Sequence, residues 1–120
     1  PFNEELFEQH VRTLLKRYHD FTAIFAGHDR IAYLIQAVAP EYGLRIPEDM
    51  SLVGYDDLSV MHQLPVPLTT VHQPWFRMGQ LAVSKIDNIL AGRDTDLGGL
   101  TILECPLIVR ESTGPAPKTG

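Results

Sequence analysis

The sequence predicts an α/β domain built around a parallel sheet, and three observations support that prediction. Short apolar runs that suit buried strands alternate with longer segments whose apolar residues recur at the 3.6-residue period of a helix. The first two runs are separated by about 25 residues with a helical pattern, which is the arrangement of a βαβ unit. The 120 residues match the length of one domain.

The first part of the chain predicts two helices on either side of a strand. Residues 3–18 carry an apolar stripe at helical spacing, made of Phe7, Val11, Leu14, Leu15 and Tyr18. Asn3 can cap that helix, because its side-chain oxygen can accept from a free amide of the first turn. The apolar run from Phe21 to Ala26 suits a buried strand. A second helix follows, with Asp29 as its expected N-cap and Gly43 as its expected C-cap.

The rest of the chain predicts strands around a third helix. Residues 51–55 (SLVGY) and 68–72 (LTTVH) suit buried strands, and an apolar face at helical spacing predicts a helix over residues 74–91. Two shorter stretches, 100–103 and 107–109, provide further strand material. The expected order of elements is therefore α-β-α-β-β-α-β-β.

Composition and charge exclude several classes of protein. Apolar residues make up 44% and charged residues 21% of the chain, as in a folded globular protein. The net charge is −5 and Lys and Arg do not cluster, so this chain is a poor candidate for direct contact with nucleic acid. No apolar run approaches the ~18 residues of a membrane span, and the first residues form no signal peptide. The single cysteine, Cys105, cannot form an internal disulfide, which is compatible with a cytoplasmic location.

Polar residues follow each of three predicted strands. The first strand is followed by His28 and Asp29, the second by Asp56 and Asp57, and the third by Gln73. In open α/β sheets, ligands bind beyond the carboxyl ends of the strands. A carboxylate, an imidazole and a carboxamide that converge there suit a ligand rich in hydroxyl groups, because together they can accept and donate hydrogen bonds.

Several of these residues also have simpler interpretations. Asp29 is expected to be an N-cap, and Asp57 to be a turn or cap residue rather than a ligand contact. The histidines lack metal-ligand spacing, and the chain has no nucleophile-elbow, P-loop or zinc-protease motif, so no metal site and no cofactor are expected. One enzymatic alternative stays open, in which Asp56 and Asp57 act as acid and base or hold magnesium.

Five sequence strings carry a resemblance to a known family. They are Thr22–Asp29 (TAIFAGHD), Gly43–Asp57 (GLRIPEDMSLVGYDD), Pro67–Pro74 (PLTTVHQP), Met78-Gly79 and Leu107–Thr113 (LIVREST). In the same order, they resemble the effector-binding domain of the lac-repressor-type (LacI/GalR) transcription regulators. The resemblance covers nearly the whole chain.

The resemblance implies a partial domain of the type I periplasmic-binding-protein-like fold, a three-layer α/β/α parallel sheet. Residues 1–113 would form the C-terminal portion of a sugar-sensing effector-binding domain. Most of this portion would belong to the second lobe, with the helix at 74–91 directed toward the first lobe. Residues 114–120 would form a flexible tail.

The function implied is the sensing and dimerisation part of a bacterial sugar-responsive repressor, in which a sugar or sugar derivative changes operator affinity allosterically. Operator DNA would be bound through a domain absent from this chain, by a cytoplasmic homodimer without a cofactor or a membrane contact. A periplasmic sugar-binding protein of a transporter has the same lobes and remains an alternative, as does the magnesium-dependent enzyme that would use Asp56 and Asp57.

The resemblance also assigns roles to individual positions. The ligand contacts that it implies are Asp56, His28, Gln73 and Phe2. The dimer contacts that it implies are Tyr33, Leu34 and Leu64, and the sequence alone equally allows these three residues to belong to the core. At the position of His28 the family usually has Asn, and this departure changes the size and the titration behaviour of a side chain expected to touch the ligand.

Overall fold

A computed structural model describes residues 3–93 and 99–117. The chain divides into two compact units, the first formed by Pro1–His72 together with Leu107–Gly120 and the second by Gln73–Pro106. The helices and strands of the first unit are α1 (Glu4–Leu15), β1 (Ala23–Phe25), α2 (Asp29–Val38), β2 (Ser51–Asp56), β3 (Thr69–His72) and β4 (Leu107–Ile108). Short 3₁₀ helices join them, namely η1 (Tyr18–Asp20), η2 (Ala39–Tyr42) and η3 (Ser59–Gln63). The second unit contains α3 (Trp75–Leu90).

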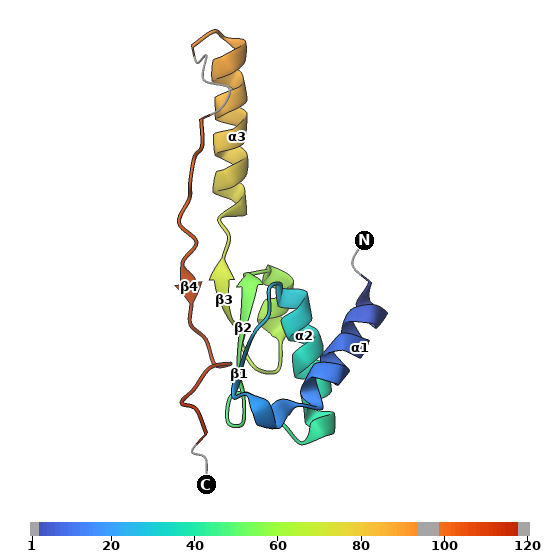
Figure 1. Ribbon diagram of the computed structural model, residues 1–120. Coiled ribbons are helices and arrows are strands. Elements are labelled where there is room, and N and C mark those ends of the chain that lie inside the picture. The colour runs from blue at the N-terminus through green and yellow to red at the C-terminus, as the bar shows by residue number, and fades with distance from the viewer. Residues whose placement is uncertain (1–2, 94–98, 118–120) are drawn as a thin grey trace. The chain divides into compact units, whose positions relative to one another are not determined.

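The strands of the first unit form one sheet in the order β1-β2-β3-β4 (Figure 1). β1, β2 and β3 are parallel, with Phe25 opposite Val53 and Asp56 opposite His72. The predicted parallel α/β sheet is therefore confirmed for three strands. β4 departs from it by running antiparallel to β3, because the chain returns from the second unit at Leu107 and passes β3 in the reverse direction.

Residues 100–103, which the sequence predicted as strand material, are not part of the sheet. They belong to the second unit, where Thr101 and Leu103 line a small hollow together with Met78 and Leu81 of α3. Among the described residues of that unit there is no strand for them to pair with. This segment therefore contacts a helix in place of a strand.

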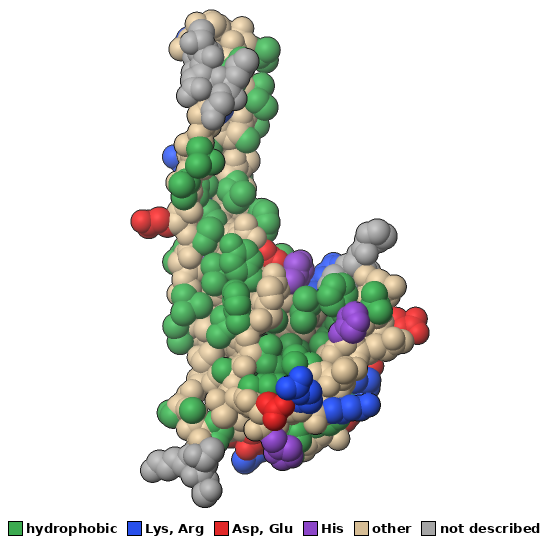
Figure 2. Space-filling model, in the orientation of Figure 1, with side chains coloured by type: hydrophobic (Ala, Val, Ile, Leu, Met, Phe, Trp, Pro, Cys, Tyr) green, Lys and Arg blue, Asp and Glu red, His purple; other side chains and the backbone are tan. Residues whose placement is uncertain are grey.

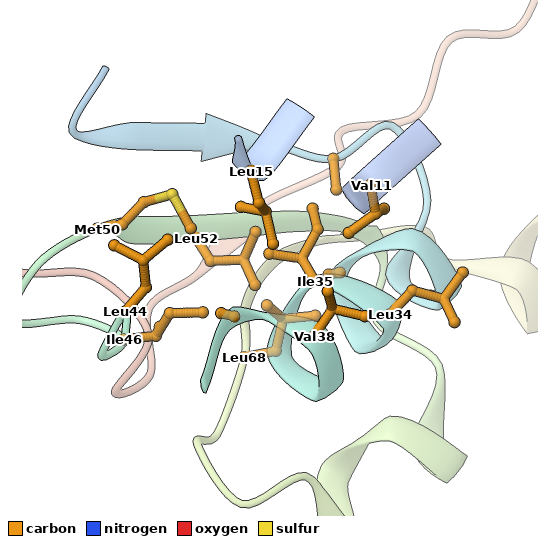
Figure 3. Packing of buried hydrophobic residues seen from close by; sticks show 13 residues of the cluster. Val11, Leu15, Leu34, Ile35, Val38, Leu44, Ile46, Met50, Leu52 and Leu68 are labelled. Carbon is orange, nitrogen blue, oxygen red and sulfur yellow. The ribbon is translucent and has the colours of Figure 1, made fainter. Parts of the chain in front are cut away.

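The core of the first unit lies between the sheet and helices α1 and α2. Leu15 of α1, Ile35 of α2 and Leu52 of β2 are fully buried and belong to one cluster (Figure 3). Side chains alternate along β2, so that Leu52, Gly54 and Asp56 are buried while the residues between them are partly exposed. Burial of this apolar face is what holds the two helices on the sheet.

The opposite face of the sheet is more open. Phe25 on β1 is 64% exposed and Leu107 on β4 is 53% exposed. In the described part of the first unit, α1 and α2 pack against each other, and they lie on the same side of the sheet (Figure 1). The second helical layer of a three-layer architecture is thus not among the described residues of this unit.

The ends of the helices differ from the sequence prediction in ways that have local causes. α1 ends at Leu15, and the chain turns through η1, where Arg17 pairs with Asp20 at 2.9 Å. α2 ends at Val38 because Pro40 has no amide to continue the α-helical hydrogen bonds. The predicted C-cap at Gly43 instead closes η2, with a positive φ of 71° that suits glycine.

A short segment after β4 fastens the amino-terminal ends of two strands. The Ser112 hydroxyl accepts from the Thr69 amide at 2.8 Å and donates to the Leu52 carbonyl. The Leu52 amide donates to the Ser112 carbonyl at 2.7 Å, and Gly114 exchanges hydrogen bonds with the Ser51 hydroxyl. We call residues 110–114 the C-terminal strap.

In the second unit, α3 contains no buried residue. Its exposed apolar side chains include Trp75, Phe76, Met78, Val83, Ile86 and Leu90. Figure 2 shows hydrophobic side chains along this part of the chain. Within residues 3–93 and 99–117, no helix has both the length and the apolar character needed to cross a membrane.

Candidate functional site

The carboxyl ends of the three parallel strands lie at one edge of the sheet, as the sequence predicted. β2 ends at Asp56, which pairs with His72 at the end of β3. β1 leads through Gly27 into His28, which stands directly before α2. The first unit thus brings His28 and Asp56 together, with the His28 Nε2 atom 3.3 Å from the Asp56 Oδ2 atom. We call this pair the strand-end pair.

The two side chains of the strand-end pair differ in burial. The Asp56 side chain is 9% exposed, whereas the His28 side chain is 40% exposed. Asp56 is the last residue of β2 and is packed within the fold. Its carboxylate offers hydrogen-bond acceptors at a strand end where ligands of open α/β sheets bind.

The backbone at the end of β2 is unusual. Asp56 has a φ of 114° and Asp57 has a φ of 55°, although neither residue is glycine. L-residues rarely adopt positive φ, and such conformations persist only where surrounding contacts enforce them. Such contacts are present here: the Asp57 side chain contacts Arg110 and two histidines, and the amide of the following residue, Leu58, donates to Asp29.

Asp57 is the centre of an ionic cluster. Arg110 Nη2 donates to Asp57 Oδ1 at 2.8 Å, His62 Nε2 lies 3.0 Å from the same oxygen, and His72 Nδ1 lies 2.9 Å from Oδ2. Burial raises the pKa of the Asp57 carboxyl, but its hydrogen bonds with Arg110, His62 and His72 outweigh burial, and the net effect lowers that pKa. The predicted turn or cap residue therefore joins η3, β3 and the C-terminal strap.

Asp29 is not the N-cap that the sequence predicted. The cap of α2 is His28, whose Nδ1 atom accepts from the Arg30 amide at 3.1 Å. Asp29 is 1% exposed and accepts from the Thr70 hydroxyl at 2.6 Å and from the Leu58 amide at 2.9 Å. Its carboxylate thus supports the turn that follows Asp57, since Leu58 belongs to that turn.

Gly54, in the middle of β2, explains how Asp29 fits. A Cβ atom at this position would collide with Asp29 Oδ1 and would lie 2.8 Å from a methyl group of Leu68. Glycine inside a strand often marks a close approach of another group. This was the one sequence signal that could have indicated a buried side chain above β2. No comparable signal indicated the partners of Asp57.

The other predicted site residues are placed as follows. Gln73 is the first residue of the second unit, where its carbonyl oxygen accepts from the Trp75 amide at 2.8 Å. Phe2 lies outside the described residues. Of the predicted dimer contacts, Tyr33 is 43% exposed, Leu34 is buried in the core and Leu64 is partly buried against it.

The chemistry available at the strand ends is hydrogen bonding. In the described ranges, no three His, Cys, Asp or Glu side chains form a group that could hold a metal ion. One carboxylate, that of Asp57, is already compensated by the Arg110 guanidinium. The strand-end pair, in contrast, combines an acceptor and an imidazole, which suits hydroxyl groups.

Comparison with known proteins gives a consistent result. Residues 3–113 match the model of the periplasmic binding protein-like domain. The transcriptional regulator CelR of Thermobifida fusca is 37% identical over 102 residues, which cover 85% of this chain and 30% of CelR. The chain therefore spans about a third of the length of this relative.

Two solved structures are similar in fold and sequence. A complex of the regulator CelR with cellobiose has a TM-score of 0.82 and 35% identity, covering 92% of this chain and 34% of that one. A lac repressor dimer bound to operator and the anti-inducer ONPF has a TM-score of 0.80 and 29% identity, covering 89% of this chain and 37% of that one. The fold seen here is thus that of a segment of larger regulators.

Proposed function

The chain belongs to the periplasmic binding protein-like domain family, and on that premise we propose that it is the ligand-sensing and dimerisation part of a bacterial sugar-responsive transcription repressor. Binding of a sugar or sugar derivative changes the affinity of the whole protein for its operator. Two similar structures support this proposal, one a regulator with cellobiose and the other a repressor dimer on its operator.

The strand-end pair is the observation that carries the proposal. Asp56 is buried, yet it contacts the half-exposed imidazole of His28 at the carboxyl edge of the sheet. A carboxylate accepts hydrogen bonds from two ligand hydroxyls without needing a metal or a nucleophile. Gln73 and Phe2 are proposed to complete the ligand contacts.

Such a site acts by shifting populations. A ligand that binds one conformation of the whole protein more tightly raises the population of that conformation. If the two conformations differ in their affinity for the operator, the observed operator affinity changes accordingly. A switch from almost fully bound to almost fully free operator needs a difference of about 5.5 kcal/mol between the two states. Several hydroxyl contacts of the kind that Asp56 offers can supply a difference of this size.

Partners and location follow from the same proposal. Because this chain has a net charge of −5, it is poorly suited to contact DNA, and we propose that a separate domain binds the operator. We propose that the homodimer forms through a surface that includes the exposed Tyr33, the buried Leu34 and the partly buried Leu64. The proposed protein is cytoplasmic and needs no cofactor.

We also propose that the chain is not an enzyme. The magnesium-dependent alternative needs both Asp56 and Asp57 as free carboxylates, but Asp57 accepts from Arg110 and contacts two histidines. The transporter alternative shares the lobes of the fold. The similar regulators favour the repressor over it.

The Asp56→Asn substitution tests the proposal, because it keeps the shape of the side chain and removes the charge. In the complete gene product, we expect binding of the responsive sugar, found by thermal shift in a panel of free mono- and disaccharides that includes cellobiose, to weaken more than about tenfold. Operator release at a fixed sugar concentration should be lost with it. Asp20→Asn, at an exposed pair with Arg17, is the matched control and should respond normally. Normal operator release by the Asp56→Asn protein would contradict the site assignment.

A further inference from the structure

The ionic cluster around Asp57 lies where the chain passes between the two units. The chain leaves the first unit after His72 and re-enters it at Leu107. These two points are neighbours in the sheet, because β3 and β4 are antiparallel and Val71 lies opposite Leu107. A side chain that reaches this end of β3 can therefore hold both passages of the chain at once.

Asp57 holds both passages with its two carboxylate oxygens. His72, the last residue before the chain leaves, places its Nδ1 atom 2.9 Å from Asp57 Oδ2. Arg110, which follows β4 after the chain returns, donates from Nη2 to Asp57 Oδ1 at 2.8 Å. A carboxylate oxygen can only accept, so the His72 ring donates through Nδ1 whether it is neutral or protonated. We call Asp57, His72 and Arg110 the passage clamp.

Arg110 is also held near the beginning of β3. Its guanidinium donates to the Leu68 carbonyl at 2.9 Å, and its backbone amide donates to the Thr69 hydroxyl at 2.9 Å. The side chains of Arg110 and Asp57 are 23% and 10% exposed, so solvent and salt screen this charged pair less than they screen a surface pair. The passage clamp is thus a fixed part of the first unit.

The clamp begins one residue after the proposed ligand contact. Asp56 and Asp57 are joined by one peptide bond, and both have positive φ, 114° and 55°. Strained backbone of this kind persists only where surrounding contacts enforce it. A change in the Asp56 backbone on ligand binding therefore moves the Asp57 carboxylate and, through it, both passages of the chain.

Resting on the proposed function, we propose that Asp57, His72 and Arg110 are positioning residues that couple a ligand at Asp56 to the segments joining the two units. The clamp itself does not contact the sugar. It sets how strongly bound sugar changes operator affinity, and it leaves the sugar affinity of the operator-free protein nearly unchanged. Sugar changes the operator Kd by the same factor by which operator changes the sugar Kd, so one ratio measures this coupling.

His72 offers a matched pair of variants. Asparagine carries an amide nitrogen on Cγ, as histidine carries Nδ1, so His72→Asn keeps a donor for Asp57. Leucine has a similar branched shape and no donor. Because the His72 side chain is 42% exposed, neither substitution opens a cavity in the core.

The ratio of the operator Kd with and without the responsive free sugar, measured on the complete gene product, tests the coupling. We expect His72→Leu to reduce this ratio more than about fivefold, while its sugar Kd without operator stays within about threefold of the parent value. His72→Asn should keep the parent ratio, as should His19→Leu, which removes an exposed imidazole from η1. An unchanged ratio in His72→Leu would overturn the proposal, and so would an equal loss of sugar affinity, although the proposed sensor function would stand.

Hydrogen exchange without sugar tests the clamp itself. The Glu111 amide, which donates to the Pro67 carbonyl, belongs to the C-terminal strap and lies far from His72 in the sequence. We expect His72→Leu to speed the exchange of this amide and of the Arg110 amide at least about threefold, and His72→Asn to leave both near the parent rate. Unchanged exchange in His72→Leu would overturn the inference. A parent protein that responded to no sugar in the panel would count against the proposed function alone, and the exchange rates would still decide whether the clamp exists.

Discussion

At the scale of single residues, two adjacent acids at the end of β2 have different tasks. Asp56 contacts His28 at 3.3 Å, whereas Asp57 accepts from Arg110 at 2.8 Å and contacts two histidines. Both residues have positive φ, so the turn that separates their side chains is itself strained. We infer that the Asp57 cluster holds this turn and thereby fixes the direction of the Asp56 carboxylate.

The Asp57→Asn substitution should lower the stability of the fold at neutral pH. The neutral amide weakens the hydrogen bonds from Arg110 and the histidines, and we expect the free energy of unfolding to fall by about 1–3 kcal/mol. Urea unfolding followed by circular dichroism measures this change. Asp20→Asn at an exposed ion pair is the control, and its effect should be smaller. Equal effects of the two substitutions would show that the cluster does not stabilise the fold.

The pH dependence of this effect has a definite sign. The native cluster lowers the pKa of Asp57 below that of an unfolded aspartate, which is about 3.9. Its stabilising contribution is therefore fully present above pH ~4 and is lost as the pH falls through the native pKa. The difference in unfolding free energy between the parent protein and the Asp57→Asn variant should accordingly shrink below pH ~4. A difference that stays constant down to pH ~3 would contradict this assignment.

At the scale of elements, the C-terminal strap secures the sheet where its ladder is incomplete. The β2–β3 ladder begins only at Val53 and Thr69, and the strap satisfies the Leu52 amide and the Thr69 amide beyond that point. Buried backbone groups need such partners, since an unpaired one costs about as much as a lost hydrogen bond. Arg110, at the start of the strap, donates to the Leu68 carbonyl at 2.9 Å and to Asp57, so it connects the strap to the residue before β3 and to the residue after β2.

Ser112→Ala tests the role of the strap. Ser112 is fully buried, and removal of its hydroxyl leaves the Thr69 amide and the Leu52 carbonyl with one partner fewer. We expect a loss of about 1–3 kcal/mol in unfolding free energy, measured by urea denaturation. Ser59→Ala, at an exposed position of η3, should change it by less than about 0.5 kcal/mol. If Ser112→Ala and Ser59→Ala lowered the free energy of unfolding by similar amounts, the hydrogen bonds of the strap would not stabilise the fold.

At the scale of the whole molecule, the two units differ in how well they are packed. The first unit has a cluster of buried apolar side chains around Leu15, Ile35 and Leu52, whereas α3 of the second unit has no buried residue. Helices gain most of their stability from burying an apolar face. The chain also spans about a third of the length of the similar regulators. The proposed function therefore places the contacts that stabilise α3 in the rest of the complete protein.

Hydrogen exchange tests this difference between the units. In the isolated chain we expect the amides of α3 to exchange at least about tenfold faster than those of β2, because α3 opens without exposing a core. In the complete gene product the protection of α3 should rise, while that of β2 changes little. Equal protection of α3 and β2 in the isolated chain would contradict the prediction, and unchanged α3 protection in the complete protein would count against the proposed packing onto a first lobe.

The sequence by itself determined the helices and the parallel strands, because apolar periodicity and caps are local signals that the residues of each element carry. It also brought His28 and Asp56 to one edge of the sheet, since the ends of parallel strands meet there.

Only the tertiary structure decided what the remaining polar side chains do. Asp29 bonds Thr70 across 41 positions and Asp57 bonds Arg110 across 53, so no local pattern encodes either pair. Because the buried Asp29 carboxylate accepts from Thr70 and Leu58, it does not cap α2, and His28 caps that helix. The position of the His28 imidazole beside Asp56 therefore depends on contacts between distant parts of the chain.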